Sequence, residues 1–87
     1  VIYTDVWISM GNEAQTKQRL KDFQKFQVTS SLLNGAKKEA VFMHCMPVQP
    51  GREVAIGIVN HAKSIVYRQA ENRLYAQQSI LELMLKQ

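Results

Sequence analysis

The sequence predicts an α/β fold: a three-layer, doubly wound parallel sheet of three strands joined by crossover helices. Short apolar runs rich in β-branched and aromatic residues, at 1–7, 40–44 and 64–67, alternate with longer stretches of helical periodicity. The connections between these runs are long enough for parallel pairing with right-handed crossovers. Each run also ends in a polar cluster: in chain order Asp5 with Ser9-Met10-Gly11, His44-Cys45-Met46-Pro47, and Ala70-Glu71-Asn72-Arg73. Because open parallel sheets bind ligands beyond the carboxyl ends of their strands, we expect the three clusters to share one site.

Four helices are expected between and after these strands. The first begins at Asn12, a residue type that caps helix N-termini, and the second covers 29–35 between a capping threonine and a glycine stop. A weak third helix covers 52–60, with Gly57 in its middle costing on the order of 1 kcal/mol relative to alanine. The last helix covers 70–86, and its apolar residues extend beyond one stripe, so we expect it to need partners on more than one side.

Length and composition limit the chain to one modest unit. With 87 residues, of which 46% are hydrophobic, it can bury only a small core. The sequence opens with Val1 directly inside an apolar, β-rich run, without a leading turn or cap. We therefore interpret it as the C-terminal piece of a larger protein.

Charge and cysteine content argue against several partner classes. The formal net charge is +4, but the basic residues of the first helix alternate with glutamine and aspartate rather than with aromatic residues, so we predict no nucleic-acid partner. The single cysteine, Cys45, excludes an internal disulfide and favours a reducing interior. No apolar run approaches the roughly 20 residues of a membrane helix, so no membrane association is expected.

Two charged residues stand where structure alone does not require them. Asp5 lies in an apolar run, and a buried carboxylate must be paired, hydrogen-bonded or protonated. It can cap the nearby turn or hold an ammonium group. Arg73 lies in the first turn of a helix, where the macrodipole does not favour a cation, so it is placed either for an anion or for an ion pair with Glu71 or Glu13.

Cys45 is the candidate nucleophile or polar contact of the second cluster. A lone cysteine is more often a small buried hydrophobe, but this one follows a strand. His44 is a poor base for it, because adjacent strand residues point to opposite faces. His44, Cys45 and His61 also lack a recognised ligand spacing, so we predict no metal site.

Three segments together resemble a known enzyme family. They are Asp5-Val6-Trp7-Ile8-Ser9-Met10-Gly11, Phe42-Met43-His44-Cys45-Met46-Pro47 and Ala70-Glu71-Asn72-Arg73. In this order they resemble the ornithine carbamoyltransferases, and the resemblance covers essentially the whole chain. Aspartate carbamoyltransferases carry proline where Cys45 stands, and putrescine carbamoyltransferases lack the Ser-Met-Gly loop.

The resemblance implies specific roles. Asp5, Ser9 and Met10 would hold the amino-acid end of L-ornithine, and Cys45 would lie beside its side-chain amine. The backbone carbonyls of Cys45 and Met46 would orient the carbamoyl amide, and Arg73 would bind carbamoyl phosphate. The products of the family's reaction are L-citrulline and phosphate, and it needs no metal or other cofactor.

The resemblance also implies the surroundings of this segment. It would be the C-terminal part of the ornithine-binding domain (1–87) of a two-domain enzyme, whose carbamoyl-phosphate-binding N-terminal domain is absent from this sequence. Neighbouring subunits of a homotrimer would complete the site, in the cytoplasm or, in a eukaryote, the mitochondrial matrix. The alternative is a non-catalytic amino-acid-binding or structural module derived from this fold.

Overall fold

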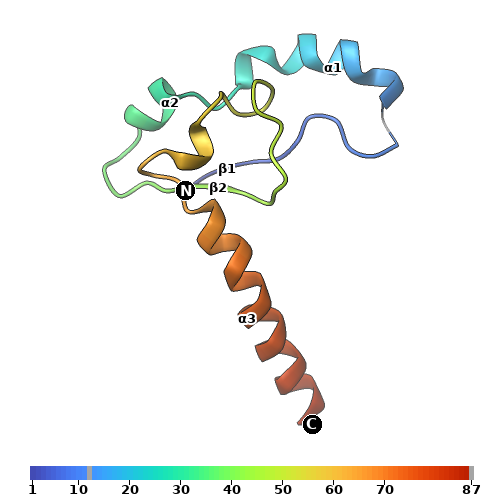
Figure 1. The fold of residues 1–87 in the computed structure, drawn as a ribbon, viewed down its shortest axis with the longest axis vertical. Coiled ribbons are helices and arrows are strands. Elements are labelled where there is room, and N and C mark those ends of the chain that lie inside the picture. The colour runs from blue at the N-terminus through green and yellow to red at the C-terminus, as the bar shows by residue number, and fades with distance from the viewer. Residues whose placement is uncertain (12, 87) are drawn as a thin grey trace.

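Two short parallel strands lie at the centre of the computed structural model, which describes residues 1–11 and 13–86. Strand β1 (Ile2–Thr4) pairs with β2 (Phe42–His44), with Ile2 opposite Phe42 and Thr4 opposite His44. The two strands run side by side through the middle of the body in Figure 1. The predicted runs at 1–7 and 40–44 are therefore confirmed as strands, each shorter than expected.

The connection between the strands contains two helices, as expected. Helix α1 (Thr16–Phe23) lies between two 3-10 turns, η1 (Glu13–Gln15) and η2 (Gln24–Phe26). The predicted cap at Asn12 lies outside the described residues. Helix α2 (Ser30–Asn34) begins as predicted, because the Thr29 hydroxyl accepts a hydrogen bond from the Leu32 N–H at 3.2 Å.

The helix expected over 52–60 was wrong. Val54 instead forms a bridge with Val28, in which the Val28 N–H donates to the Glu53 carbonyl and the Ala55 N–H to the Val28 carbonyl, both at 2.9 Å. This extended pairing takes the backbone groups that a helix would use. Only a 3-10 turn η3 (Ile58–Asn60) follows Gly57, whose φ of 89° starts a new direction of the chain.

The third expected strand is reduced to one bridge. Ser64 pairs with Phe42, and the Ile65 N–H donates to the Phe42 carbonyl at 3.0 Å. The chain then turns into α3 (Val66–Leu85), so Val66 and Tyr67, expected in a strand, belong to the helix. In the described part of the chain the sheet thus has two strands, and the three-layer arrangement stays a prediction.

The core is small and lies where α2, β2, η3 and the start of α3 meet. Its buried hydrophobic residues are Val28, Leu33, Phe42, Val54, Ile58 and Val66. Figure 1 shows α3 leaving this body and projecting away from it. Of the 20 residues of α3 only Val66 is buried.

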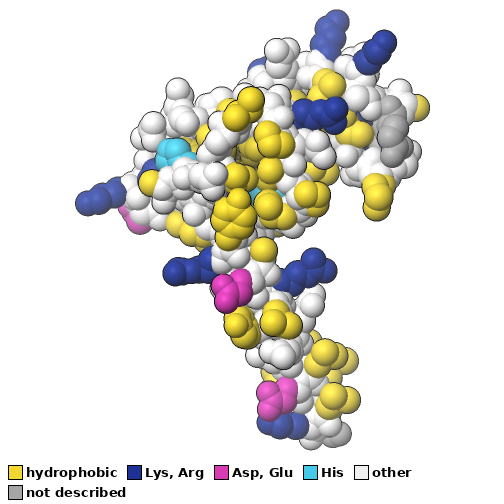
Figure 2. Space-filling view, viewed as in Figure 1, with side chains coloured by type: hydrophobic (Ala, Val, Ile, Leu, Met, Phe, Trp, Pro, Cys, Tyr) yellow, Lys and Arg dark blue, Asp and Glu magenta, His cyan; other side chains and the backbone are white. Residues whose placement is uncertain are grey.

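The apolar surface of α3 therefore has no cover within the described structure. Its exposed apolar side chains are Tyr67, Leu74, Tyr75, Ile80, Leu81, Leu83, Met84 and Leu85. Figure 2 shows hydrophobic side chains along the projecting helix. That this helix needs partners on more than one side stays a prediction, and these exposed apolar side chains are its basis in the structure.

Candidate functional site

Asp5 and Cys45 meet at the carboxyl edge of the sheet. Each directly follows a strand, and the parallel register that pairs Thr4 with His44 places the next residues side by side. The Cys45 Sγ lies 3.1 Å from the Asp5 Oδ1, and the same carboxylate oxygen accepts the Val6 N–H at 2.6 Å. Asp5 of the first cluster and Cys45 of the second therefore lie together, as the rule for parallel strands predicts.

The contact shifts the ionisation of both groups in opposite directions. Hydrogen bonds from the Cys45 thiol and from the Val6 N–H lower the pKa of Asp5. Hydrogen bonding to the Asp5 carboxylate raises the pKa of Cys45, and burial and the carboxylate charge raise it further. The pair therefore holds a carboxylate and a protonated thiol at neutral pH, which suits binding of a cation better than nucleophilic attack.

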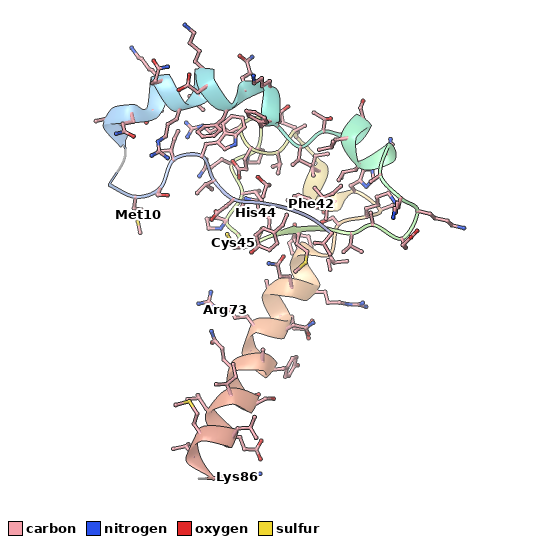
Figure 3. The ribbon with its side chains drawn as sticks, turned by 180° about the vertical axis from the view of Figure 1, so that it is seen from behind. Met10, Phe42, His44, Cys45, Arg73 and Lys86 are labelled. Carbon is pink, nitrogen blue, oxygen red and sulfur yellow. The ribbon has the colours of Figure 1, made fainter. Side chains whose placement is uncertain are left out.

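A depression of about 290 Å³ adjoins this pair. Its lining residues come from β1, from β2 and the residue after it, and from α3, namely Tyr3, His44, Cys45, Gln69, Ala70 and Arg73. Figure 3 shows Arg73 extending from α3 on the side of the molecule where Cys45 lies. Among the described side chains, Arg73 forms no ion pair with Glu71, one of its two predicted partners. The side chain of the other, Glu13, is not among those that the structure describes. The guanidinium is thus available to an anion beside the thiol.

The Ser9 and Met10 loop is not part of this depression. Both side chains are exposed, and Met10 is 98% exposed. Figure 3 shows Met10 at the far end of the loop between β1 and α1, away from Cys45. The two residues predicted for the substrate's amino-acid end therefore do not join Asp5 in this conformation.

Met46 contributes its backbone. Its φ of 59° is in the left-handed region, and its N–H donates to the His44 Nδ1 at 2.8 Å. The peptide bond that joins Met46 to Pro47 is cis. A left-handed residue here turns the chain sharply after Cys45.

A buried pair, which the sequence did not predict, supports this turn. The His44 Nε2 lies 2.9 Å from the Glu53 Oε1, with both side chains fully buried. Because the His44 Nδ1 accepts the Met46 N–H, the Nε2 carries the proton and donates to the carboxylate. The Glu53 Oε1 also accepts the Gln49 N–H at 2.8 Å, so this one oxygen holds both ends of the loop. In the sequence, the only indication of this pair was that His44 and Glu53 are ionisable residues within or beside apolar runs.

Gln69 and Tyr3 were also missed. The Gln69 Oε1 accepts the His44 N–H at 3.0 Å, and its Nε2 donates to the Tyr3 hydroxyl at 3.2 Å. Both residues line the depression. A glutamine one turn before Arg73 was the sign in the sequence.

A larger depression, of about 570 Å³, lies elsewhere. Its lining residues are Trp7, Leu20, Lys21, Gln24, Gln27, Gly51 and Arg52. It holds none of the predicted site residues, and it lacks the paired carboxylate and thiol, so chemistry favours the smaller one. In residues 1–11 and 13–86 no cluster of three metal-ligating side chains occurs, and no helix there is long and apolar enough to cross a membrane.

Comparisons with known proteins agree with the resemblance in the sequence. The family described as aspartate/ornithine carbamoyltransferase, Asp/Orn binding domain, matches residues 1–84. The ornithine carbamoyltransferase of Oceanobacillus iheyensis is 49% identical over 85 residues, which cover 98% of this chain and 26% of that protein. That of Methanopyrus kandleri is 46% identical over 85 residues, covering 98% and 27%.

Solved structures agree as well. The ornithine carbamoyltransferase from Pyrococcus furiosus superposes with a TM-score of 0.80 at 49% identity, over 92% of this chain and 26% of that one. The anabolic enzyme from Campylobacter jejuni gives a TM-score of 0.86 at 33% identity, over 97% and 28%. The chain spans about a quarter of the length of these relatives. The chain belongs to the aspartate/ornithine carbamoyltransferase family, within the segment described as the Asp/Orn binding domain.

Proposed function

We propose that residues 1–87 supply the ornithine-binding part of an ornithine carbamoyltransferase, which transfers the carbamoyl group of carbamoyl phosphate to the side-chain amine of L-ornithine. The observation that carries this proposal is the meeting of Asp5 and Cys45 at 3.1 Å, beside the depression that Arg73 lines. The family match and the names of the relatives support it. Carbamoyl-phosphate-binding residues would come from an N-terminal domain, and neighbouring subunits of a cytoplasmic homotrimer would complete the site.

The charges of the site fit the two substrates. The Asp5 carboxylate, with its lowered pKa, remains ionised and can hold the α-ammonium of ornithine. Arg73 offers a planar guanidinium, which suits a phosphate. Ser9 and Met10 would reach the amino acid only if their loop moves toward Asp5. Gly11, with φ of 91°, ends that loop in a backbone conformation that favours glycine.

The reaction requires a neutral amine. An ornithine side-chain amine resembles that of lysine, with a reference pKa near ~10.4, so it must lose a proton before it attacks. Its lone pair then forms a C–N bond to the carbamoyl carbon, and the C–O bond to phosphate breaks with the electron pair leaving on the phosphate. The attacking nitrogen gives up one further proton, which the departing phosphate accepts. The protonated Cys45 thiol and the carbonyls of Cys45 and Met46 would contact the amine and the carbamoyl amide. Arg73 would stabilise charge on the leaving oxygens, an effect typically worth roughly 3 to 4 kcal/mol for a preorganised donor.

The doubly wound, three-layer sheet belongs to this proposal. The two strands described here would be extended by strands of the longer polypeptide, and its helices would cover the open faces. Such a cover would also bury the apolar surface of α3.

A chimera tests the proposal. Residues 1–87 would replace the matching segment of the Oceanobacillus iheyensis relative, and citrulline formation would be measured. We expect activity in the chimera, none in the isolated 87-residue chain, and at least about a 30-fold lower kcat/KM for ornithine after Asp5→Asn, since a charge pair with the substrate is lost. Cys45→Ser should lower it too, whereas Asp22→Asn, on the exposed face of α1, should not.

The opposite result is equally clear. A chimera that folds and elutes like the unmodified relative, binds carbamoyl phosphate and forms no citrulline would overturn the enzymatic proposal. It would favour the non-catalytic module.

A further inference from the structure

We propose that Gln69 is a positioning residue, which fixes Arg73 of α3 relative to Cys45 of the strand edge through two hydrogen bonds of its side-chain amide. The inference rests on the proposed function for its kinetic consequence only. Its structural basis is the two hydrogen bonds of Gln69 and the depression that Gln69 lines together with Cys45 and Arg73.

The Gln69 amide joins three separate elements. Its oxygen accepts the N–H of His44, the last residue of β2, at 3.0 Å, and its nitrogen donates to the hydroxyl of Tyr3 in β1 at 3.2 Å. Gln69 itself lies in the first turn of α3. One side chain therefore links the helix to both strands, two positions before Asp5 and one position before Cys45.

Gln69 is also the last point at which the described helix is attached to the body. Val66 is buried and Gln69 is half-buried, whereas every described residue of α3 from Ala70 onward is exposed. The side-chain hydrogen bonds recorded beyond it, Ser79 with Tyr75 and Lys86 with Glu82, are internal to the helix region. In this structure, the direction of the helix where Arg73 emerges is thus set by Val66 and Gln69.

The helical spacing of Gln69 and Arg73 means that fixing the first turn of α3 also fixes the place from which the Arg73 guanidinium extends. Arg73 follows Gln69 by four positions, so the two side chains lie on the same face of the helix, about 6 Å apart at their Cβ atoms. Both line the depression with Cys45. A rotation of the first turn of α3 would carry Arg73 away from the thiol, and the two bonds of Gln69 resist such a rotation.

Tyr3 connects the same network to the thiol. Tyr3 and Cys45 line the same depression. Hydrogen bonding with Tyr3 is the smaller of two effects that lower the pKa of Cys45, against the larger raising effect of Asp5. Gln69 thus bonds a tyrosine that lines the same depression as the thiol. Gln69 arranges the phenol, the thiol-bearing strand edge and the guanidinium together.

Substitutions of Gln69 test this role. Gln69→Leu removes both bonds at similar volume, while Gln69→Glu keeps the acceptor for the His44 N–H and can accept the Tyr3 hydroxyl. Gln78→Leu, the same change at an exposed position of α3, is the control. Amide hydrogen exchange at His44 would be measured in the 87-residue chain, and kcat and both KM values in the chimera.

We expect faster His44 exchange in Gln69→Leu and protection close to that of the unmodified chain in Gln69→Glu and Gln78→Leu. In the chimera, Gln69→Leu should lower kcat about 10- to 100-fold and raise KM for carbamoyl phosphate, with less than about a twofold change in KM for ornithine, because misplacement of about 1 Å has effects of this size. Gln69→Glu should recover activity to within about threefold.

Unchanged His44 exchange in Gln69→Leu, or an activity of Gln69→Glu no better than that of Gln69→Leu, would overturn the inference. Should Gln69→Leu fail to fold, Tyr3→Phe, which removes only the second partner, would be compared with Gln69→Glu by the same two measurements. A chimera that folds and binds carbamoyl phosphate but is inactive would refute the proposed function alone, since the exchange measurement in the 87-residue chain decides the positioning role without turnover.

Discussion

The Cys45 thiol donates a hydrogen bond to the Asp5 carboxylate across 3.1 Å, although 40 positions separate the two residues in the chain. This bond joins the edges of both strands and raises the pKa of the thiol while lowering that of the carboxyl group. At neutral pH the sulfur is therefore a hydrogen-bond donor rather than a thiolate. Its proposed place beside a substrate amine needs no covalent intermediate.

Removal of the carboxylate charge should make Cys45 more reactive. Asp5→Asn lowers the thiol pKa toward its ordinary value, because the carboxylate that opposes ionisation is gone. At a pH below the thiol pKa, each pKa unit by which the substitution lowers that pKa raises the thiolate fraction about tenfold and makes the thiolate intrinsically less nucleophilic. Alkylation by iodoacetamide should therefore accelerate about threefold for each such pKa unit. Mass spectrometry of the single cysteine between pH 6 and 10 would measure the rate.

The same bond gives a pH dependence with a defined sign. Since the folded-state pKa of Cys45 is raised, the bonded thiol stabilises the fold below the ordinary thiol pKa, and this contribution disappears as the pH rises through the folded-state value.

For the alkylation experiment, Asp22→Asn is the control. Equal rates in Asp5→Asn and the unmodified chain would contradict the contact.

The His44 and Glu53 pair should carry a large share of the stability. Glu53→Ala leaves the buried His44 Nε2–H without its acceptor, at about 1 to 3 kcal/mol, and also removes the acceptor of the part-buried Gln49 N–H. Glu53→Gln keeps an acceptor oxygen and should cost less. Urea unfolding followed by tryptophan fluorescence would measure both, with Glu39→Gln as the exposed control. A loss below about 1 kcal/mol in Glu53→Ala would show that the pair is not holding the loop.

Equal substitutions at a buried and an exposed leucine should separate the core from the surface of α3. Leu33 is fully buried, so Leu33→Ala should lower the free energy of unfolding by about 2 to 5 kcal/mol. Leu81 is 58% exposed, so Leu81→Ala should change it by less than about 0.5 kcal/mol. Comparable losses in urea unfolding would mean that α3 is covered in solution.

The threonine cap should be worth a measurable amount. Thr29→Ala removes the acceptor of the Leu32 N–H and should cost about 1 kcal/mol, whereas Thr29→Ser retains the hydroxyl. Ser30→Ala, at the first helical position, provides the control in the same unfolding assay. The prediction fails if Thr29→Ser destabilises as much as Thr29→Ala.

Local signals in the sequence predicted local structure well. The threonine and glycine that bound α2 act on the adjacent backbone, so they could be read directly. The helix expected over 52–60 failed because Val54 pairs with Val28, a contact from a distant part of the chain that the local pattern does not contain. The strand expected to include Val66 failed because the downstream helix extends back through that residue.

Some residues of the candidate site could likewise be predicted from the sequence, and others could not. Asp5 and Cys45 could be placed together because parallel strands align their carboxyl ends, a rule of topology rather than of spacing. The buried partner of His44 could not be named, since Glu53 meets it only through the turn at Met46. Ser9 and Met10 were expected at the same place from the family resemblance, but their side chains are exposed and do not line the depression.

The left-handed backbone of Met46 restricts which amino acids this corner tolerates. A side chain branched at Cβ is strongly disfavoured at φ near +60°, so valine, isoleucine and threonine should be rejected there, while unbranched residues, asparagine and glycine remain acceptable. The requirement at Met46 is thus on the backbone conformation, and the chemical identity of the side chain matters less. Variation at this position among functional homologues should follow that filter.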